Sequence, residues 1–289
     1  MLRFTHAPGY SVIGARIQAP KCELNVVEHC NLACRSCSHL SPLLPKRIVD
    51  PAAISRDLVA LNQHYHAKSV RLLGGEPLLH PNLLGVVEAV RQSGVGDEIW
   101  LITNGVLLPR MSAELWRALD CVAVSMYPGK ELTASEQRRC RKRARAARTQ
   151  LLVRRCDEFR TSYSEKGTSD RALASQIFQA CQVVHIWRCH TVADGRFYKC
   201  PQSYLLPKLV EGCAVNQSLD SLAISDSDDF GRELLAYLES PEPLATCGHC
   251  LGTSGRLFPH TQVRRVEFRG LQRRAAEELV EPSLLNTIP

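Results

Sequence analysis

The sequence predicts an α/β fold in which a parallel sheet is built from repeated strand–helix units. From about residue 22, short runs rich in β-branched residues alternate with longer amphipathic stretches, which is the pattern of βα units. Prolines stand where two of these stretches begin, and proline suits the first turn of a helix. A chain of 289 residues has room for one large domain with a small appendage.

The expected elements follow one another in chain order. Strands are expected at residues 22–28, 69–73, 98–103, 121–127 and 150–155, and helices at 51–66, 81–93, 110–119 and about 137–148. After a further helix ending near Ala180 the pattern changes. Asp194 and Gly195 then lie between two extended segments, which is the sequence signal of a β-hairpin. A second, smaller domain is therefore expected from Cys181.

Composition and charge exclude several classes of protein. Apolar residues make up 45% and charged residues 22%, as in globular proteins, and no apolar run is long enough for a membrane span. Residues 1–20 lack the features of an export signal, so a cytoplasmic location is expected. The formal charge of +7 is concentrated in residues 137–148, which we interpret as a solvated helix face. An acidic partner could dock there. The stretch has no interleaved aromatic residues, so nucleic-acid binding is not favoured.

The thirteen cysteines are expected to bind metal, because thiols stay reduced in the cytoplasm. Cys30, Cys34 and Cys37 form a C-x3-C-x2-C pattern directly after the first strand. Three thiolates on one loop can hold three irons of a 4Fe-4S cluster and leave the fourth iron open. The alternative is a zinc site completed by His29 or His39.

A second polar segment follows the second strand and consists of Gly74, Gly75, Glu76 and Pro77. Glycines allow a backbone to approach a ligand closely, and a carboxylate accepts hydrogen bonds from an ammonium group. Ligands of parallel barrels gather at the carboxyl ends of the strands, so this segment and the cysteine loop describe one site. Asn104 and Ser125 end the next two strands and are expected to face the same pocket.

The segment CNLACRSC, residues 30–37, resembles the cluster motif of the radical S-adenosylmethionine (SAM) superfamily. The resemblance implies that the open iron binds the methionine part of SAM and that an electron cleaves SAM to a 5'-deoxyadenosyl radical. It also implies that residues 74–77 bind the amino group of SAM and that Asn104 and Ser125 contact its ribose or carboxylate. These two are equally explained as turn residues with local hydrogen bonds. Ser36 replaces the family's aromatic residue, which weakens the expected packing on adenine.

Five further cysteines are concentrated in the C-terminal region, and they are Cys181, Cys189, Cys200, Cys247 and Cys250. The segments CHTVADGRFYKCP and CGHC resemble the cysteine-bearing hairpin of Twitch and SPASM domains, which implies one auxiliary 4Fe-4S cluster of the Twitch type. Cys200, Cys247 and Cys250 are expected ligands.

The fourth auxiliary ligand stays open. Cys181 fits the family spacing, whereas Cys189 lies opposite Cys200 if Asp194 and Gly195 form a two-residue turn. The surplus thiol could return a hydrogen atom to a substrate radical. A zinc knuckle completed by His249 or His260 is the alternative for this region.

These observations predict a partial (β/α)6 TIM-like barrel over residues 22–180 and a Twitch-like β-hairpin domain over 181–262. An extension, 1–21, precedes them, and a C-terminal helix and tail, 263–289, follow. The resemblance implies dehydrogenation, epimerisation or dehydration of a small polar substrate, such as a sugar, aminocyclitol or nucleoside, in a biosynthetic pathway for a natural product. It also implies a reducing partner such as flavodoxin or ferredoxin. Modification of a ribosomal peptide and a non-catalytic zinc-binding interaction module are the alternatives.

Overall fold

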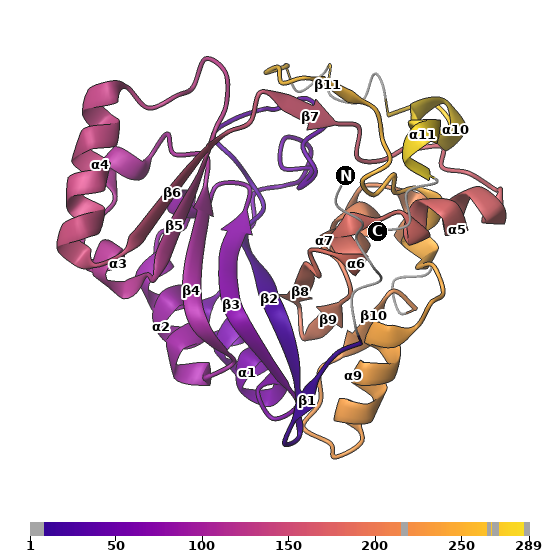
Figure 1. Ribbon diagram of the computed structural model, residues 1–289, viewed down its shortest axis with the longest axis horizontal. Helices are drawn as coiled ribbons and strands as arrows, with labels where there is room; N and C mark the ends of the chain where they lie inside the picture. The colour runs from indigo at the N-terminus through magenta and orange to yellow at the C-terminus, as the bar shows by residue number, and fades with distance from the viewer. Residues whose placement is uncertain (1–8, 215–218, 265–266, 268–271, 286–289) are drawn as a thin grey trace.

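The computed structural model describes residues 9–214, 219–264, 267 and 272–285, so parts of the expected extension 1–21 and of the tail 263–289 lie outside it. One sheet organises these residues (Figure 1). Its strands are β1 (Val12–Ile13), β2 (Arg16–Val27), β3 (Tyr65–Gly74), β4 (Gly96–Thr103), β5 (Cys121–Met126), β6 (Gln150–Arg155), β8 (His190–Ala193), β9 (Arg196–Tyr198) and β10 (Ser221–Ala223). Their order is β10-β9-β8-β2-β3-β4-β5-β6, with β1 paired to β2.

The strands β2 to β6 are parallel, which confirms the α/β class. The helices between them are α1 (Pro51–Leu61), α2 (Leu83–Ser93), α3 (Ala113–Ala118) and α4 (Ala134–Ala147). Asp50 begins α1 by accepting a hydrogen bond from Ala52 N, and Thr133 begins α4 with a capping box. Among the described residues the sheet stays open, with β6 and β10 at its edges. The predicted end of the helix 51–66 was wrong, because α1 ends at Leu61 and β3 begins at Tyr65.

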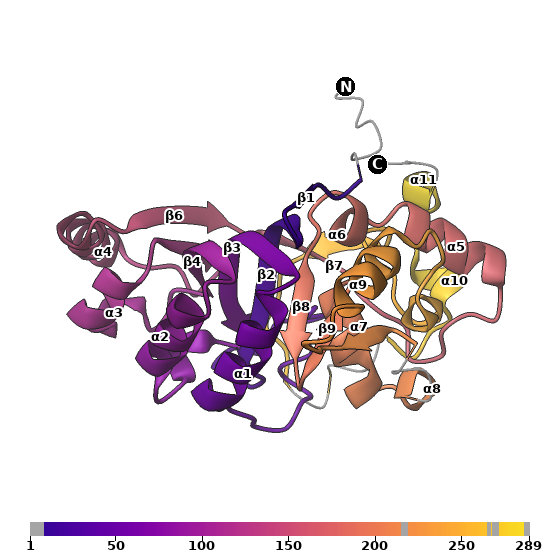
Figure 2. The same cartoon turned by 90° about the horizontal axis from the view of Figure 1, so that it is seen from below.

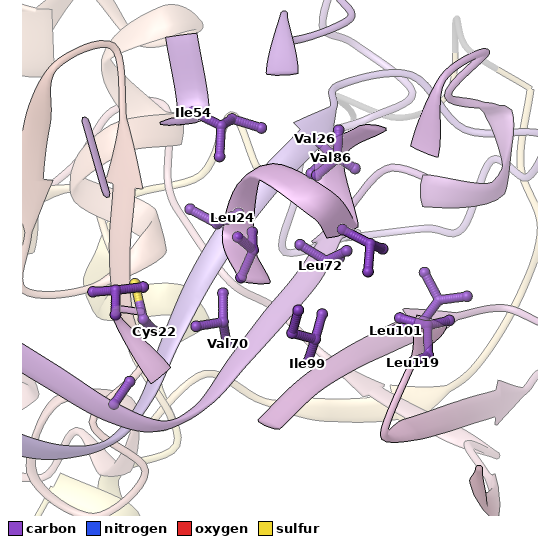
Figure 3. Packing of buried hydrophobic residues seen from close by; sticks show 14 of the residues in the cluster. Cys22, Leu24, Val26, Ile54, Val70, Leu72, Val86, Ile99, Leu101 and Leu119 are labelled. Atoms are coloured by element: carbon purple, nitrogen blue, oxygen red, sulfur yellow. The ribbon is translucent and has the colours of Figure 1, made fainter. Parts of the chain in front are cut away.

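The main core lies between the sheet and α1 to α3, which lie along one face of it in Figure 2, while α4 lies beside the edge strand β6. Alternate residues of the strands point toward these helices, as period-two strands require. Figure 3 shows Cys22, Leu24, Val26, Val70, Leu72, Ile99 and Leu101 from the strands, together with Ile54, Val86 and Leu119. The residues between them on β2 to β4 therefore face the opposite side, which the parallel barrel would enclose.

The C-terminal region adds a hairpin to the same sheet. Strands β8 and β9 turn at Asp194 and Gly195, whose φ angles of 54° and 70° confirm the two-residue turn. Strand β8 pairs parallel to β2, with His190 beside Cys22, so the hairpin continues the barrel sheet. The surrounding helices are α5 (Arg171–Gln179), α6 (Gln182–His185), α7 (Pro201–Leu205), α8 (Glu211–Ala214) and α9 (Phe230–Glu239). The boundary at Cys181 stays a prediction.

Two short strands form a separate ribbon, which lies beyond the carboxyl ends of the sheet strands in Figure 1. Strand β7 (Glu158–Arg160) pairs antiparallel with β11 (Leu257–Pro259). The segment after β6 therefore leaves the main sheet and joins the C-terminal part of the chain. The C-terminal region contains α10 (Ala276–Leu279) and α11 (Pro282–Leu285). Over the described ranges, the structure holds no helix long and apolar enough to cross a membrane.

Candidate active site

The loop after β2 carries Cys30, Cys34 and Cys37 and turns back on itself. Leu32 N donates to Cys30 Sγ at 3.4 Å, and Cys37 N donates to the Cys34 carbonyl at 3.2 Å. Burial raises the pKa of Cys30 and of Cys34 to about 12, and each of these thiols lies close enough to Cys37 to sense its charge. A metal cluster would supply the positive charge that such buried thiolates need.

Ser36, which departs from the family pattern, has a structural role in this loop. Its φ angle is 51°, a left-handed conformation that bulky side chains rarely adopt. The side chain is buried, and its hydroxyl accepts a hydrogen bond from Gln272 Nε2 at 2.6 Å. The serine therefore fixes the cysteine loop to the C-terminal part of the chain.

The two glycines at the end of β3, Gly74 and Gly75, are required by the backbone that leads into the cysteine loop. A Cβ atom on Gly74 would lie 2.0 Å from Val27 O, and one on Gly75 would lie 1.9 Å from His29 O. Gly75 N and Glu76 N donate to these carbonyls at 2.9 and 3.1 Å. The close approach expected for a ligand is thus made by the backbone that precedes Cys30.

The Glu76 carboxylate is fully buried and already holds three hydrogen bonds. It accepts from Thr103 Oγ1 at 2.7 Å, from Asn104 N at 2.8 Å and from Leu78 N at 3.1 Å. Burial raises the pKa of Glu76, and these hydrogen bonds oppose the shift. Glu76 also caps the short helix that begins at Pro77. Its carboxylate joins the ends of β3 and β4.

Asn104 extends this connection to the cysteine loop. Its Nδ2 donates to Asn31 Oδ1 at 2.7 Å and lies 3.6 Å from Cys30 Sγ. Its Oδ1 accepts from Val106 N at 3.0 Å, so the local turn interpretation also fits. The structure therefore brings Cys30, Glu76 and Asn104 together. Ser125 is the last but one residue of β5 and is paired in register with Arg154 of β6, so its place in the pocket stays a prediction.

Replacing Glu76 by glutamine is expected to weaken both folding and SAM binding. The amide nitrogen must face a backbone N–H, that of Leu78 or Asn104, which costs about 1–3 kcal/mol of unfolding free energy. Displacement of Asn104 should lower SAM affinity about tenfold, or ~1.4 kcal/mol. Denaturant unfolding and SAM titration check both values. Glu88→Gln, on the exposed side of α2, is the control, and unchanged SAM affinity in Glu76→Gln would remove this residue from the site.

The face of the sheet that points away from α1 to α3, here called the open face, carries polar residues that the sequence analysis did not identify. Glu23, Arg71 and Trp100 occupy one row across β2, β3 and β4, and the Arg71 guanidinium lies 4.9 Å from the Trp100 ring centroid. Asn25 is 4% exposed, and both of its amide atoms lack a partner within the described part of the chain. Buried polar atoms normally have partners. Glu23 and Asn25 stand at alternate positions of the buried strand β2, and this pattern could have revealed a polar face from the sequence.

Cys189 belongs to this open face. Its thiol lies near the Glu23 carboxylate and near Arg71. Burial raises the pKa of Cys189 and also that of Glu23. Cys189 is thus separated from the other C-terminal cysteines and placed next to the polar row.

Four of the five cysteines considered for the auxiliary cluster surround one cavity. The cavity is small, with a volume of about 20 Å³, and has an apolar wall that includes Phe178 and Leu244. Gly252 is required beside it, since its φ is 51° and a Cβ atom there would lie 3.0 Å from Cys181 Sγ. The four cysteines are Cys181, Cys200, Cys247 and Cys250. The structure therefore gathers the set that includes Cys181 and leaves Cys189 outside.

The thiols around this cavity are buried and affect one another. Burial raises the pKa of Cys200 to about 11 and raises the pKa of Cys247 and of Cys250 further, with the neighbouring thiols contributing. No three His, Cys, Asp or Glu side chains in the described ranges converge closely enough for a single metal ion. A four-iron cluster takes one thiolate per iron, so its ligands need not converge on one atom.

Comparison with known proteins agrees with the first site. Residues 24–162 match the model of the radical SAM superfamily. A probable GTP 3',8-cyclase of Thermoplasma volcanium is 33% identical over 120 residues, which cover 41% of this chain and 34% of that protein. A GTP 3',8-cyclase of Mycobacterium marinum is 38% identical over 126 residues, covering 42% and 35%. The matched region spans about a third of these relatives.

A solved structure of BtrN in complex with AdoMet and 2-DOIA is 16% identical to this chain. The similarity covers 81% of this chain and 94% of that chain, with a TM-score of 0.42.

Proposed function

Because residues 24–162 place this chain in the radical SAM superfamily, we propose that Cys30, Cys34 and Cys37 hold the 4Fe-4S cluster at which SAM is cleaved. When bound there, the cluster and SAM would supply a 5'-deoxyadenosyl radical able to abstract hydrogen from a substrate. The chain's own residues hold the site together. Glu76 joins the ends of β3 and β4, and Asn104 links β4 to the cysteine loop through Asn31. This convergence of three segments on one loop carries the proposal.

An auxiliary 4Fe-4S cluster in the second cavity is the next part of the proposal. Four thiols around one cavity offer one ligand per iron, which is the usual ligand set of a closed cluster. Asp220 fixes the loop that carries Cys247, since its carboxylate accepts from Ala245 N and Thr246 N, both at 2.7 Å. Such a cluster could accept an electron from a substrate radical.

The open face of the sheet supports a small polar substrate. Glu23 and Arg71 offer opposite charges, and the amide of Asn25 offers a donor and an acceptor that lack partners in the described structure. A sugar, aminocyclitol or nucleoside carries the hydroxyl or amino groups that such residues bind. GTP, named in the relatives, has the same kinds of groups and is a candidate. A ribosomal peptide is the alternative.

The test is anaerobic reconstitution of the full chain with iron and sulfide, followed by reduction in the presence of SAM. About eight irons per chain are expected for two four-iron clusters, together with 5'-deoxyadenosine. Flavodoxin and ferredoxin are compared as reductants. Candidate substrates are a polyol, an aminocyclitol, a nucleoside, GTP and a peptide, each followed by mass spectrometry. A colourless zinc protein that forms no 5'-deoxyadenosine would refute the proposal.

A further inference from the structure

The segment after β11 lies against the cysteine loop, although the two are far apart in the sequence. Arg35 N donates to Thr261 O and Val263 N donates to Ala33 O, both at 2.9 Å. Between these bonds, Cys34 and Gln262 form an antiparallel bridge. The C-terminal segment thus forms a short edge strand along the loop and places one side chain next to a cysteine sulfur.

The side chain of Gln262 uses both ends of its amide on this loop. Its Oε1 accepts from Ala33 N at 2.8 Å, and its Nε2 donates to Cys34 Sγ at 3.1 Å. The Ala33 N–H needs an acceptor, so it fixes which end of the amide faces the sulfur. The orientation of Nε2 therefore follows from the backbone contact.

The ring of His260 supports this arrangement from the side. His260 Nε2 lies 3.3 Å from Gln262 Nε2, and the His260 ring stacks on Tyr127 with centroids 4.8 Å apart and 15° between planes. Asn104 also has a side-chain amide near a cysteine sulfur, but its Nδ2 is 3.6 Å from Cys30 Sγ and already donates to Asn31 at 2.7 Å. Gln262 makes the shorter contact of the two.

We propose that Gln262 is a positioning residue that raises the reduction potential of the cluster held by Cys30, Cys34 and Cys37. This inference rests on the proposed function. One-electron reduction by a low-potential donor adds negative charge to the cluster and its thiolates. An N–H that donates to a thiolate stabilises the reduced form more than the oxidised form, and hydrogen bonds to sulfur are a recognised control of cluster potentials. The bond therefore makes the electron easier to accept.

The test is a potentiometric titration of the reconstituted full chain, followed by EPR spectroscopy. The relevant signal is the one that changes when SAM is added, because SAM binds the open iron. Gln262→Leu removes the donor and should decrease the equilibrium constant for reduction about tenfold, which is about 59 mV for one electron. Gln63→Leu, at an exposed turn after α1, should leave the potential unchanged.

Gln262→Glu separates the donor from the support of the loop. Its carboxylate can still accept from Ala33 N, but it cannot donate to sulfur and adds a negative charge, so the potential should fall further than in Gln262→Leu. If Gln262→Leu fails to retain iron, the potential of Gln262→Glu still tests whether the donor to Cys34 Sγ raises the cluster potential. Equal potentials in wild type, Gln262→Leu and Gln262→Glu at equal iron content would overturn the inference. A wild-type chain that binds no cluster would instead refute the proposed function.

Discussion

Replacement of Cys30, Cys34 and Cys37 together by alanine is expected to abolish 5'-deoxyadenosine formation and to halve the iron content. Each thiolate holds one iron, and the open iron exists only while the other three are held. The four-cysteine cavity lies on other elements, so the remaining iron should stay bound there. Chromatography of the reaction products and iron analysis measure the two effects.

Cys156→Ala is a suitable control for the triple variant. Cys156 follows β6, and its backbone N–H donates to Met126 O at 2.9 Å, a bond that alanine preserves. This variant should retain full iron and SAM cleavage. Undiminished 5'-deoxyadenosine in the triple variant would contradict the assignment of the cluster to these residues.

The single variants Cys181→Ala and Cys189→Ala are expected to differ in iron content. Cys181 lines the four-cysteine cavity, so its loss should prevent assembly of the auxiliary cluster and remove about half of the iron. Cys189 lies near Glu23 on the open face and not at this cavity, so Cys189→Ala should keep its iron. Iron analysis of the reconstituted variants and the EPR signal of their auxiliary cluster measure this difference. The reverse pattern would make Cys189 the ligand, and loss of iron in both would mean that both are needed.

The products formed by Cys189→Ala then distinguish two chemistries. An epimerase needs a hydrogen atom delivered to the substrate radical, and a thiol on the open face could supply it. If Cys189→Ala still cleaves SAM but yields a trapped radical or a shunt product, epimerisation is supported. Unaffected turnover would exclude this role and favour dehydration, which is redox-neutral overall, or dehydrogenation, in which the auxiliary cluster would accept the electron of the substrate radical.

Local sequence patterns predicted most of the barrel. The alternation of β-branched runs and amphipathic stretches placed the strands β2 to β6, because strand and helix periodicity depend on nearby residues. The Asp194–Gly195 pair predicted the hairpin for the same reason. The strands β7 and β11 were missed, since three-residue strands that pair across the chain leave little periodic signal.

The sequence by itself predicted which residues form the first site. Three cysteines on one loop and a Gly-Gly-Glu segment after the next strand are close in the chain, and parallel strands bring their ends to one edge. The reason for the glycines differed from the expected one. Their lack of a Cβ serves the backbone at Val27 and His29, a packing constraint that spacing does not reveal.

Only the tertiary structure decided which distant groups meet. Cys181 and Cys189 are eight residues apart in the sequence, and their spacing left both open as ligands. In the structure Cys181, and not Cys189, lines the four-cysteine cavity. Gln262 reaches Cys34 across 228 positions. Such contacts depend on how whole elements pack, and no local pattern encodes them. The sequence thus predicted the candidate ligands and the succession of the strands along the chain, and tertiary packing decided which distant groups lie together.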